Sequence, residues 1–205
     1  MSFDYILGRL LSLANPYKVI FKEKKLGVIT KNSLGIYHSD LSLIDREIGK
    51  DSEMALKLFD SEIYEARLLC SKIYNSKDLD EKLVEKWVKT FDNWEICDSF
   101  SMGVFAKSEL AISLIDKWYK REVEFEKRSS FATMSGYCMS DKKVANEVFE
   151  PFFKMIISAA DDERNFVKKA VNWSLRSIGK RNVDLRNKAI EVSNELLEMN
   201  NKTAT

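Results

Sequence analysis

The apolar and polar positions of this chain follow a helical period along most of its length. In residues 163–179, taken at about 100° per residue, the apolar side chains fill one continuous half of the helix. That half contains Phe166, Val167, Ala170, Val171, Ser174, Leu175 and Ile178. Lys169, Arg176 and Lys180 fall on the opposite half, and Trp173 lies at the margin between the two. The pattern predicts a helix that packs through one face and carries a basic stripe on the other.

Capping residues and the same period predict further helices along the chain. We expect two short helices in residues 2–25, others opening at Asp40, near Ser61 and at Asp78, and later ones over 96–105, 107–121, 122–138, 141–158, 163–179 and 183–199. Glu81, three residues after Asp78, gives a capping-box pattern. The later helices have Asp141, Asp161 or Asp162, and Asn182 as candidate caps. With two prolines, seven glycines and no sustained alternation of period two, the sequence predicts an all-α fold.

Weak internal similarity points to a repeat architecture. Residues 64–67, 125–128 and 166–169 each place an aromatic residue three positions before a basic one. The last two segments each open a helix that a second helix follows, which gives two pairs of about 37–41 residues, a length that suits HEAT-like repeats. We therefore predict antiparallel helical repeats stacked into a curved solenoid with a concave basic face. Residues 1–199 would form this single domain, and residues 200–205 a frayed tail.

Composition narrows the class of protein. Hydrophobic residues make up 45% and charged residues 32% of the chain, which is typical of a soluble globular protein. No apolar run approaches the roughly 18 residues of a membrane span, and the N-terminus lacks the basic start of a signal peptide. Three widely spaced cysteines and one histidine give no zinc set. We expect a cytoplasmic monomer that binds no metal, no cofactor and no membrane.

Charge is distributed unevenly along the chain. The net charge is only +1, yet residues 164–188 contain eight basic residues and one acid. Lysine and arginine interleaved with aromatic residues suit a phosphodiester backbone and its sugars. The ordinary alternative is a solvated helix face beside a half-buried tryptophan.

The segment "WEICD", residues 94–98, places an indole and a carboxylate four positions apart. If the segment is helical, Trp94 and Asp98 lie on one face. Alternatively, Asp98 caps a helix that starts at Ser99, and Trp94 fills the corner before it. The residues alone leave both interpretations open.

Three motifs, in this order and spacing, resemble those of the AlkD-type DNA alkylation repair family, whose members are HEAT-repeat DNA glycosylases. They are "WEICD", "FEKR" (125–128) and "FVKKAVNWSLR" (166–176), and "SLGIYHSDLSLIDREIGK" (33–50) also resembles the family's N-terminal helix entry. The likeness covers most of residues 33–190. By motif, Trp94, Asp98 and Trp173 match the family's aromatic–acid–aromatic active-site set, and Arg128 its cleft arginine. The chain departs from the family pattern at Asn93 and at Phe125, where a tryptophan is frequent.

The resemblance implies a monofunctional glycosylase that excises cationic N3- or N7-alkylated purines from duplex DNA. Asp98 would stabilise an oxocarbenium-like sugar between Trp94 and Trp173, while Arg128 and the stripe of Lys169, Arg176 and Lys180 would hold phosphates. Two alternatives stay open: a non-catalytic HEAT-repeat protein that binds bent or branched DNA, and a protein-interaction scaffold. The chain has no Walker loop, dinucleotide fingerprint or deaminase signature.

Overall fold

The computed structural model describes residues 1–140 and 144–199, and within them the protein is helical with no β-strand. The α-helices are α1 (Phe3–Ser12), α2 (Pro16–Phe21), α3 (His38–Ile48), α4 (Ser52–Asp60), α5 (Tyr64–Ile73), α6 (Glu81–Val88), α7 (Trp94–Gly103), α8 (Ala111–Trp118), α9 (Glu124–Ser140), α10 (Glu150–Ser158), α11 (Asn165–Gly179) and α12 (Val183–Glu198). A π-helix, η1 (Lys22–Leu26), continues α2, and short 3₁₀ turns η2 (Ser76–Asp78), η3 (Phe105–Lys107) and η4 (Asn146–Phe149) join later helices. The all-α prediction is confirmed.

The helix ends follow local capping chemistry. Asn182 caps α12 as predicted, since its Oδ1 accepts a hydrogen bond from the Leu185 amide at 2.9 Å. Asp80, rather than Asp78, caps the helix predicted at Asp78. The Asp162 side chain binds Arg164, and no side chain caps α11. The candidate cap Asp141 lies outside the described residues.

The short helix α4 was not predicted. It has only nine residues, with Asp51 as its cap, and it buries Met54, Ala55, Leu58 and Phe59. A nine-residue helix gives too few turns for periodicity to identify it with certainty. The sequence analysis therefore identified α5 but not α4, the helix that packs against it.

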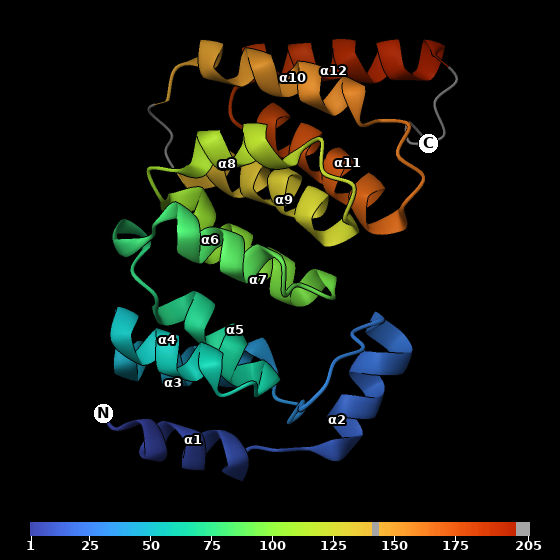
Figure 1. The fold of residues 1–205 in the computed structure, drawn as a ribbon. Helices are drawn as coiled ribbons and strands as arrows, with labels where there is room; N and C mark the ends of the chain where they lie inside the picture. The colour runs from blue at the N-terminus through green and yellow to red at the C-terminus, as the bar shows by residue number, and fades with distance from the viewer. Residues whose placement is uncertain (141–143, 200–205) are drawn as a thin grey trace.

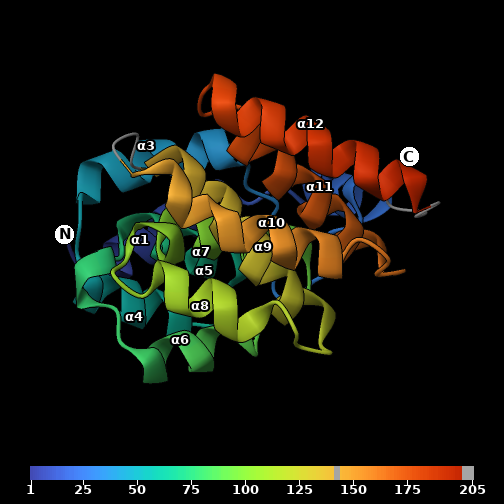
Figure 2. The same cartoon turned by 90° about the horizontal axis from the view of Figure 1, so that it is seen from above.

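The helices stack as successive antiparallel pairs, which confirms the HEAT-like repeat fold (Figure 1). The inner helices α3, α5, α7, α9 and α11 pack one against the next, while α4, α8 and α12 each pack on an inner neighbour. Figure 2 shows α4, α6 and α8 along one side of the stack and α3 along the other. Trp87, which is fully buried, anchors the first half of the core among Phe59, Tyr74 and Phe100, with ring centroids 4.9–5.5 Å away. Within the described part of the chain, no helix is long and apolar enough to span a membrane.

Two glycines bring the inner helices unusually close together. A Cβ on Gly103 would lie 2.6 Å from the Ser71 carbonyl oxygen of α5, and one on Gly136 would lie 2.6 Å from the Ala106 Cβ of η3. Such separations are below any ordinary van der Waals contact. Both glycines lie on the surface of the inner helices, where they also line the groove described next.

Candidate nucleic-acid interface

A groove of about 640 Å³ crosses the inner helices α3, α5, α7 and α9. Its lining includes His38, Lys72, Trp94, Asp98, Lys107 and Met139. The groove therefore combines one indole with the carboxylates of Asp45, Glu95 and Asp98 and with cationic or titratable side chains from three further segments. Stacking of the repeats, rather than any local loop, brings these groups together.

Trp94 and Asp98 both line the groove because they lie one turn apart on α7. The helix begins at Trp94, and Asn93 caps it by accepting hydrogen bonds from the Glu95 and Ile96 amides at 2.9 and 3.2 Å. The alternative in which Asp98 caps a helix from Ser99 is therefore wrong. The interpretation in which Trp94 and Asp98 share a helix face is confirmed.

The Asp98 carboxylate forms a bidentate ion pair with Arg128 of α9. Arg128 Nε donates to Oδ1 at 2.9 Å, and Nη2 donates to Oδ2 at 2.7 Å. The Asp98 side chain is 20% exposed and that of Arg128 is 7% exposed. Burial raises the pKa of the Asp98 carboxyl above its ordinary value, while the hydrogen bonds and charge of Arg128 act in the opposite direction. Each oxygen uses one lone pair on Arg128, so each retains acceptor capacity.

Arg128 does not open onto the surface, although segments 125–128 and 166–169 place Arg128 and Lys169 at equivalent positions. Arg128 is buried, and its Nη1 donates to the Phe166 carbonyl of α11 at 2.6 Å. Lys169, by contrast, is exposed. Although the two residues share a phase in their own helices, α9 packs between α7 and α11, so its polar face meets protein instead of solvent.

The two predicted tryptophans occupy different surroundings. The indole Nε1 of Trp94 donates to the Leu26 carbonyl at 2.9 Å, which fixes the ring at the edge of the groove. Trp173 is half-buried on α11 and is not among the residues that line the groove. Lys169 and Arg176 on α11, and Lys180 directly after it, are exposed, as the periodicity predicted. Lys180 lines a smaller cavity of about 240 Å³, which meets the groove at Met139.

A profile of the family described as "DNA alkylation repair enzyme" matches residues 10–204. The chain belongs to the DNA alkylation repair enzyme family. A solved structure also matches it, with a TM-score of 0.84 and 17% sequence identity over 96% of this chain and 83% of the other. That structure is described as "a new family of proteins related to the HEAT-like repeat DNA glycosylases with affinity for branched DNA structures". No curated protein matches the sequence.

In this DNA alkylation repair family member, no sequence pattern indicates the cations that line the groove. Lys107 is exposed, whereas Lys72 lies 3.4 Å from the Asp45 carboxylate and donates to Ser42 Oγ at 3.2 Å. The two lysines are 35 positions apart in the sequence. Both line the groove because α5 and η3 each pack against α7. Among the described residues, no cluster of histidine, cysteine or carboxylate side chains could hold a metal ion.

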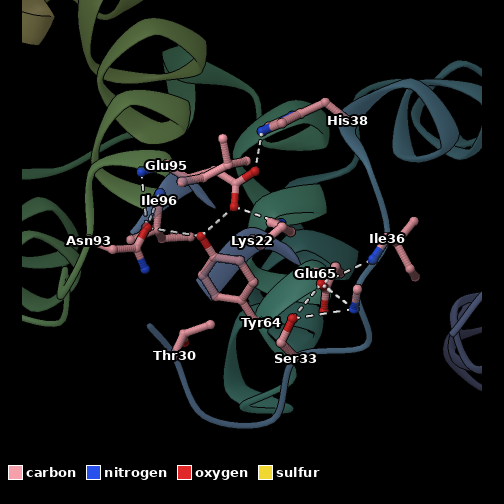
Figure 3. A network of polar contacts seen from close by, with 12 residues as sticks. Lys22, Thr30, Ser33, Ile36, His38, Tyr64, Glu65, Asn93, Glu95 and Ile96 are labelled. Carbon is pink, nitrogen blue, oxygen red and sulfur yellow. Dashed lines mark hydrogen bonds and ion pairs between the residues drawn. The ribbon is translucent and has the colours of Figure 1, made fainter. Parts of the chain in front are cut away.

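A second feature that the sequence did not reveal is a buried polar network around Glu95 (Figure 3). Glu95, the residue after Trp94 on α7, forms an ion pair with Lys22 at 2.7 Å and accepts a hydrogen bond from the Tyr64 hydroxyl at 2.8 Å. His38 Nε2 lies 3.4 Å from the other Glu95 oxygen. Burial acts to raise the pKa of Glu95, but these hydrogen bonds and the Lys22 charge bring it below its ordinary value. The network ties the N-terminal segment to the helix that carries Asp98.

Proposed function

We propose that this protein is a monofunctional DNA glycosylase that excises cationic N3- or N7-alkylated purines from duplex DNA. The observation that carries the proposal is the Asp98 carboxylate, held by Arg128 and partly exposed in a groove beside Trp94. Membership of the DNA alkylation repair enzyme family supports the same chemistry. The groove is open, so it suits recognition of the sugar and backbone more than insertion of a flipped base.

The charge on the alkylated base determines what the protein must supply. The bond between C1′ and the purine nitrogen breaks, and its electron pair passes to the cationic ring, which leaves as a neutral base. No general acid is needed for this departure. Positive charge develops on the sugar, and water then adds to C1′ while its proton passes to a basic group or to solvent. A carboxylate beside C1′ stabilises that charge and can accept a hydrogen bond from the water.

Each named residue has a distinct part in this proposal. Asp98 faces the sugar, and Arg128 orients the Asp98 carboxylate from behind. Trp94 would place its ring against the sugar or the cationic base, an attraction of about 0.5–2 kcal/mol. Trp173 would contact the DNA farther along the inner surface, on the helix that carries Lys169, Arg176 and Lys180. Those three cations would bind phosphates.

The test is release of 7-methylguanine or 3-methyladenine from alkylated duplex DNA by the wild type and by Asp98→Asn. We expect Asp98→Asn to bind DNA at least as tightly as the wild type and to release no base. Asp116→Asn, on the exposed surface of α8, is the matched control and should act like the wild type. A thermal melt of each variant separates lost chemistry from lost folding. Base release by a folded Asp98→Asn would remove Asp98 from the mechanism.

The nature of the lesion gives an independent test. Uracil and hypoxanthine are neutral bases, so each must leave as an anion unless a proton or hydrogen bond stabilises it, whereas a cationic alkylpurine leaves as a neutral molecule. We expect excision of either base to be far slower than that of 7-methylguanine. Comparable rates would show that this protein does not depend on the charge of its substrate.

A second candidate function is binding of branched DNA without excision. The structure that matches at a TM-score of 0.84 is described as having that affinity, which favours this alternative for the shared fold. It predicts salt-dependent binding of junctions and no released base from any alkylated substrate. The same base-release assay therefore separates the two functions.

A further inference from the structure

We propose that α2 and η1 form a stacking surface for unpaired bases at a branch in DNA. We name this surface the α2 face, formed by Tyr17, Ile20, Phe21, Lys24 and Lys25. The inference rests on the DNA binding of the proposed function, but not on base excision. It assigns a partner to the N-terminal segment, which carries none of the residues proposed for catalysis.

The α2 face presents apolar side chains to solvent in a regular pattern. Tyr17 is 85% exposed, and Ile20 and Phe21 are each 48% exposed. Their spacing of i, i+3 and i+4 puts them on one side of the helix, and the exposed Lys24 and Lys25 follow about one turn later. Most apolar helix faces in a globular protein are buried, so a contiguous exposed one marks a contact surface.

The other side of the segment is fixed to the body of the protein. Lys22 is 2% exposed and forms the ion pair with Glu95, as Figure 3 shows. Lys18 lies 3.4 Å from the Asp40 carboxylate and 4.3 Å from the centre of the Tyr37 ring. In Figure 1, α2 stands upright at one side of the stack while α1 lies across its base. These contacts hold the α2 face outward in a single orientation, which reduces the entropy lost on binding.

Charge and position favour nucleic acid as the occupant. Residues 16–31 contain five lysines and one glutamate. Two of the lysines are paired with carboxylates, which leaves the exposed Lys24, Lys25 and Lys31 to attract an anionic partner. The Leu26 carbonyl at the end of η1 accepts the hydrogen bond from Trp94, which places the α2 face next to the groove. Lysines bind phosphates, while the rings of Tyr17 and Phe21 offer surfaces on which a base can stack.

The α2 face should distinguish branched from continuous duplex DNA. In an intact duplex each base is already stacked on its neighbours and offers no free ring surface. At a branch or fork an unpaired base is free to stack on an aromatic side chain, which is worth about five- to 150-fold in affinity per base. The expected partner is therefore DNA that contains an unpaired base within reach of the groove.

The test uses the full chain carrying Tyr17→Ala and Phe21→Ala together. Fluorescence anisotropy measures its affinity for a three-way junction and for a continuous duplex of equal length. We expect junction affinity to fall at least five-fold and duplex affinity to stay within two-fold of the wild type. Tyr5→Ala on α1, where Tyr5 is 53% exposed, is the matched control, and Tyr17→Phe should retain binding because it keeps the ring.

A 2-aminopurine at the branch point reports stacking directly. Its fluorescence should change on binding of the wild type and not on binding of the double variant. Unchanged junction affinity, an equal loss on junction and duplex, or no DNA binding by the wild type would overturn the proposal. The proposal would also be overturned if the double variant bound junctions normally but lost binding to anionic vesicles or lost self-association, because the α2 face would then bind a membrane or a second copy of the chain. Base release measured in parallel tests excision separately, because the α2 face can select junctions whether or not Asp98 is catalytic.

Discussion

Arg128 offers the sharpest test of the proposed site, because it is buried and contacts Asp98 and Phe166, whereas its motif implies contact with DNA phosphates. We consider Arg128→Lys, which keeps the positive charge but loses the planar fork. Lysine cannot donate to both Asp98 oxygens in the guanidinium geometry and also to the Phe166 carbonyl. If Arg128 orients Asp98, the change should harm stability and catalysis while leaving contacts with DNA phosphates intact.

The magnitude follows from the three hydrogen bonds, of 2.6–2.9 Å, that the guanidinium donates. A lysine can replace one of them in good geometry. Loss of the other two should lower the free energy of unfolding by about 3 kcal/mol, since hydrogen bonds to charged groups contribute about 1.5–3 kcal/mol each. Release of Asp98 from its fixed position should also slow excision on the order of 100-fold, as expected when a reacting group is misplaced by about 1 Å.

The assay combines denaturant unfolding, single-turnover release of 7-methylguanine, and DNA affinity as a function of salt. The slope of log affinity against log salt should be the same in Arg128→Lys and the wild type, because Arg128 is buried. Lys169→Met is the control: Lys169 is exposed, so its loss should reduce the slope by about 0.9 with little effect on stability. A reduced salt slope with unchanged excision in an Arg128→Ala variant would show that Arg128 binds phosphate and does not orient Asp98.

Two further predictions concern the framework around the site. Lys22→Met leaves Glu95 buried without its cation, so it should cost about 3–5 kcal/mol of unfolding free energy at pH 7, whereas the exposed Lys24→Met should cost little. In the wild type, the lowered pKa of Glu95 contributes stability that is lost as the pH falls through that pKa. Without Lys22 the pKa of Glu95 rises, so more of the buried carboxylate is protonated at pH 5 than at pH 7. The difference in unfolding free energy between Lys22→Met and the wild type, measured with urea, should therefore be smaller at pH 5 than at pH 7. Gly103→Ala should lower stability by about 1–3 kcal/mol, because its Cβ would meet the Ser71 carbonyl, whereas Gly8→Ala, with open space around it, should not destabilise α1 in a thermal melt.

The fold could be predicted wherever one helix face meets protein and the other meets solvent. On α11, Val167, Ala170, Val171 and Leu175 are buried and Lys169 is exposed, as the period required. Periodicity predicts the buried face of α11 correctly because one half of this helix packs against protein and the other half faces solvent. The pairing of Trp94 with Asp98 could be predicted for the same reason, since it depends only on helix geometry.

The surroundings of Arg128 could not be predicted from periodicity because α9 is enclosed. Its buried residues occur all round the helix and include Ser129, Ser130, Thr133 and Ser135. An abundance of small residues in "RSSFATMSG" is the signal of close packing that the sequence contains. The Lys22–Glu95 pair left no such signal, because it joins residues that are 73 positions apart.

The ion pair also limits how much Asp98 can contribute to catalysis. With an effective dielectric constant of about 20, a carboxylate about 4 Å from a sugar cation attracts it by about 4 kcal/mol, while a guanidinium about 7 Å away repels it by about 2.4 kcal/mol. The difference, about 2 kcal/mol, is the net effect of the pair, whereas Asp98→Asn would lose the whole attraction and keep the repulsion, which should slow base release by about 10³-fold. Asp98 would then act on a bond already weakened by the cationic base, and it could not compensate for a neutral one. The geometry of Asp98 and Arg128 thus accounts for both the proposed activity and the proposed restriction to charged lesions.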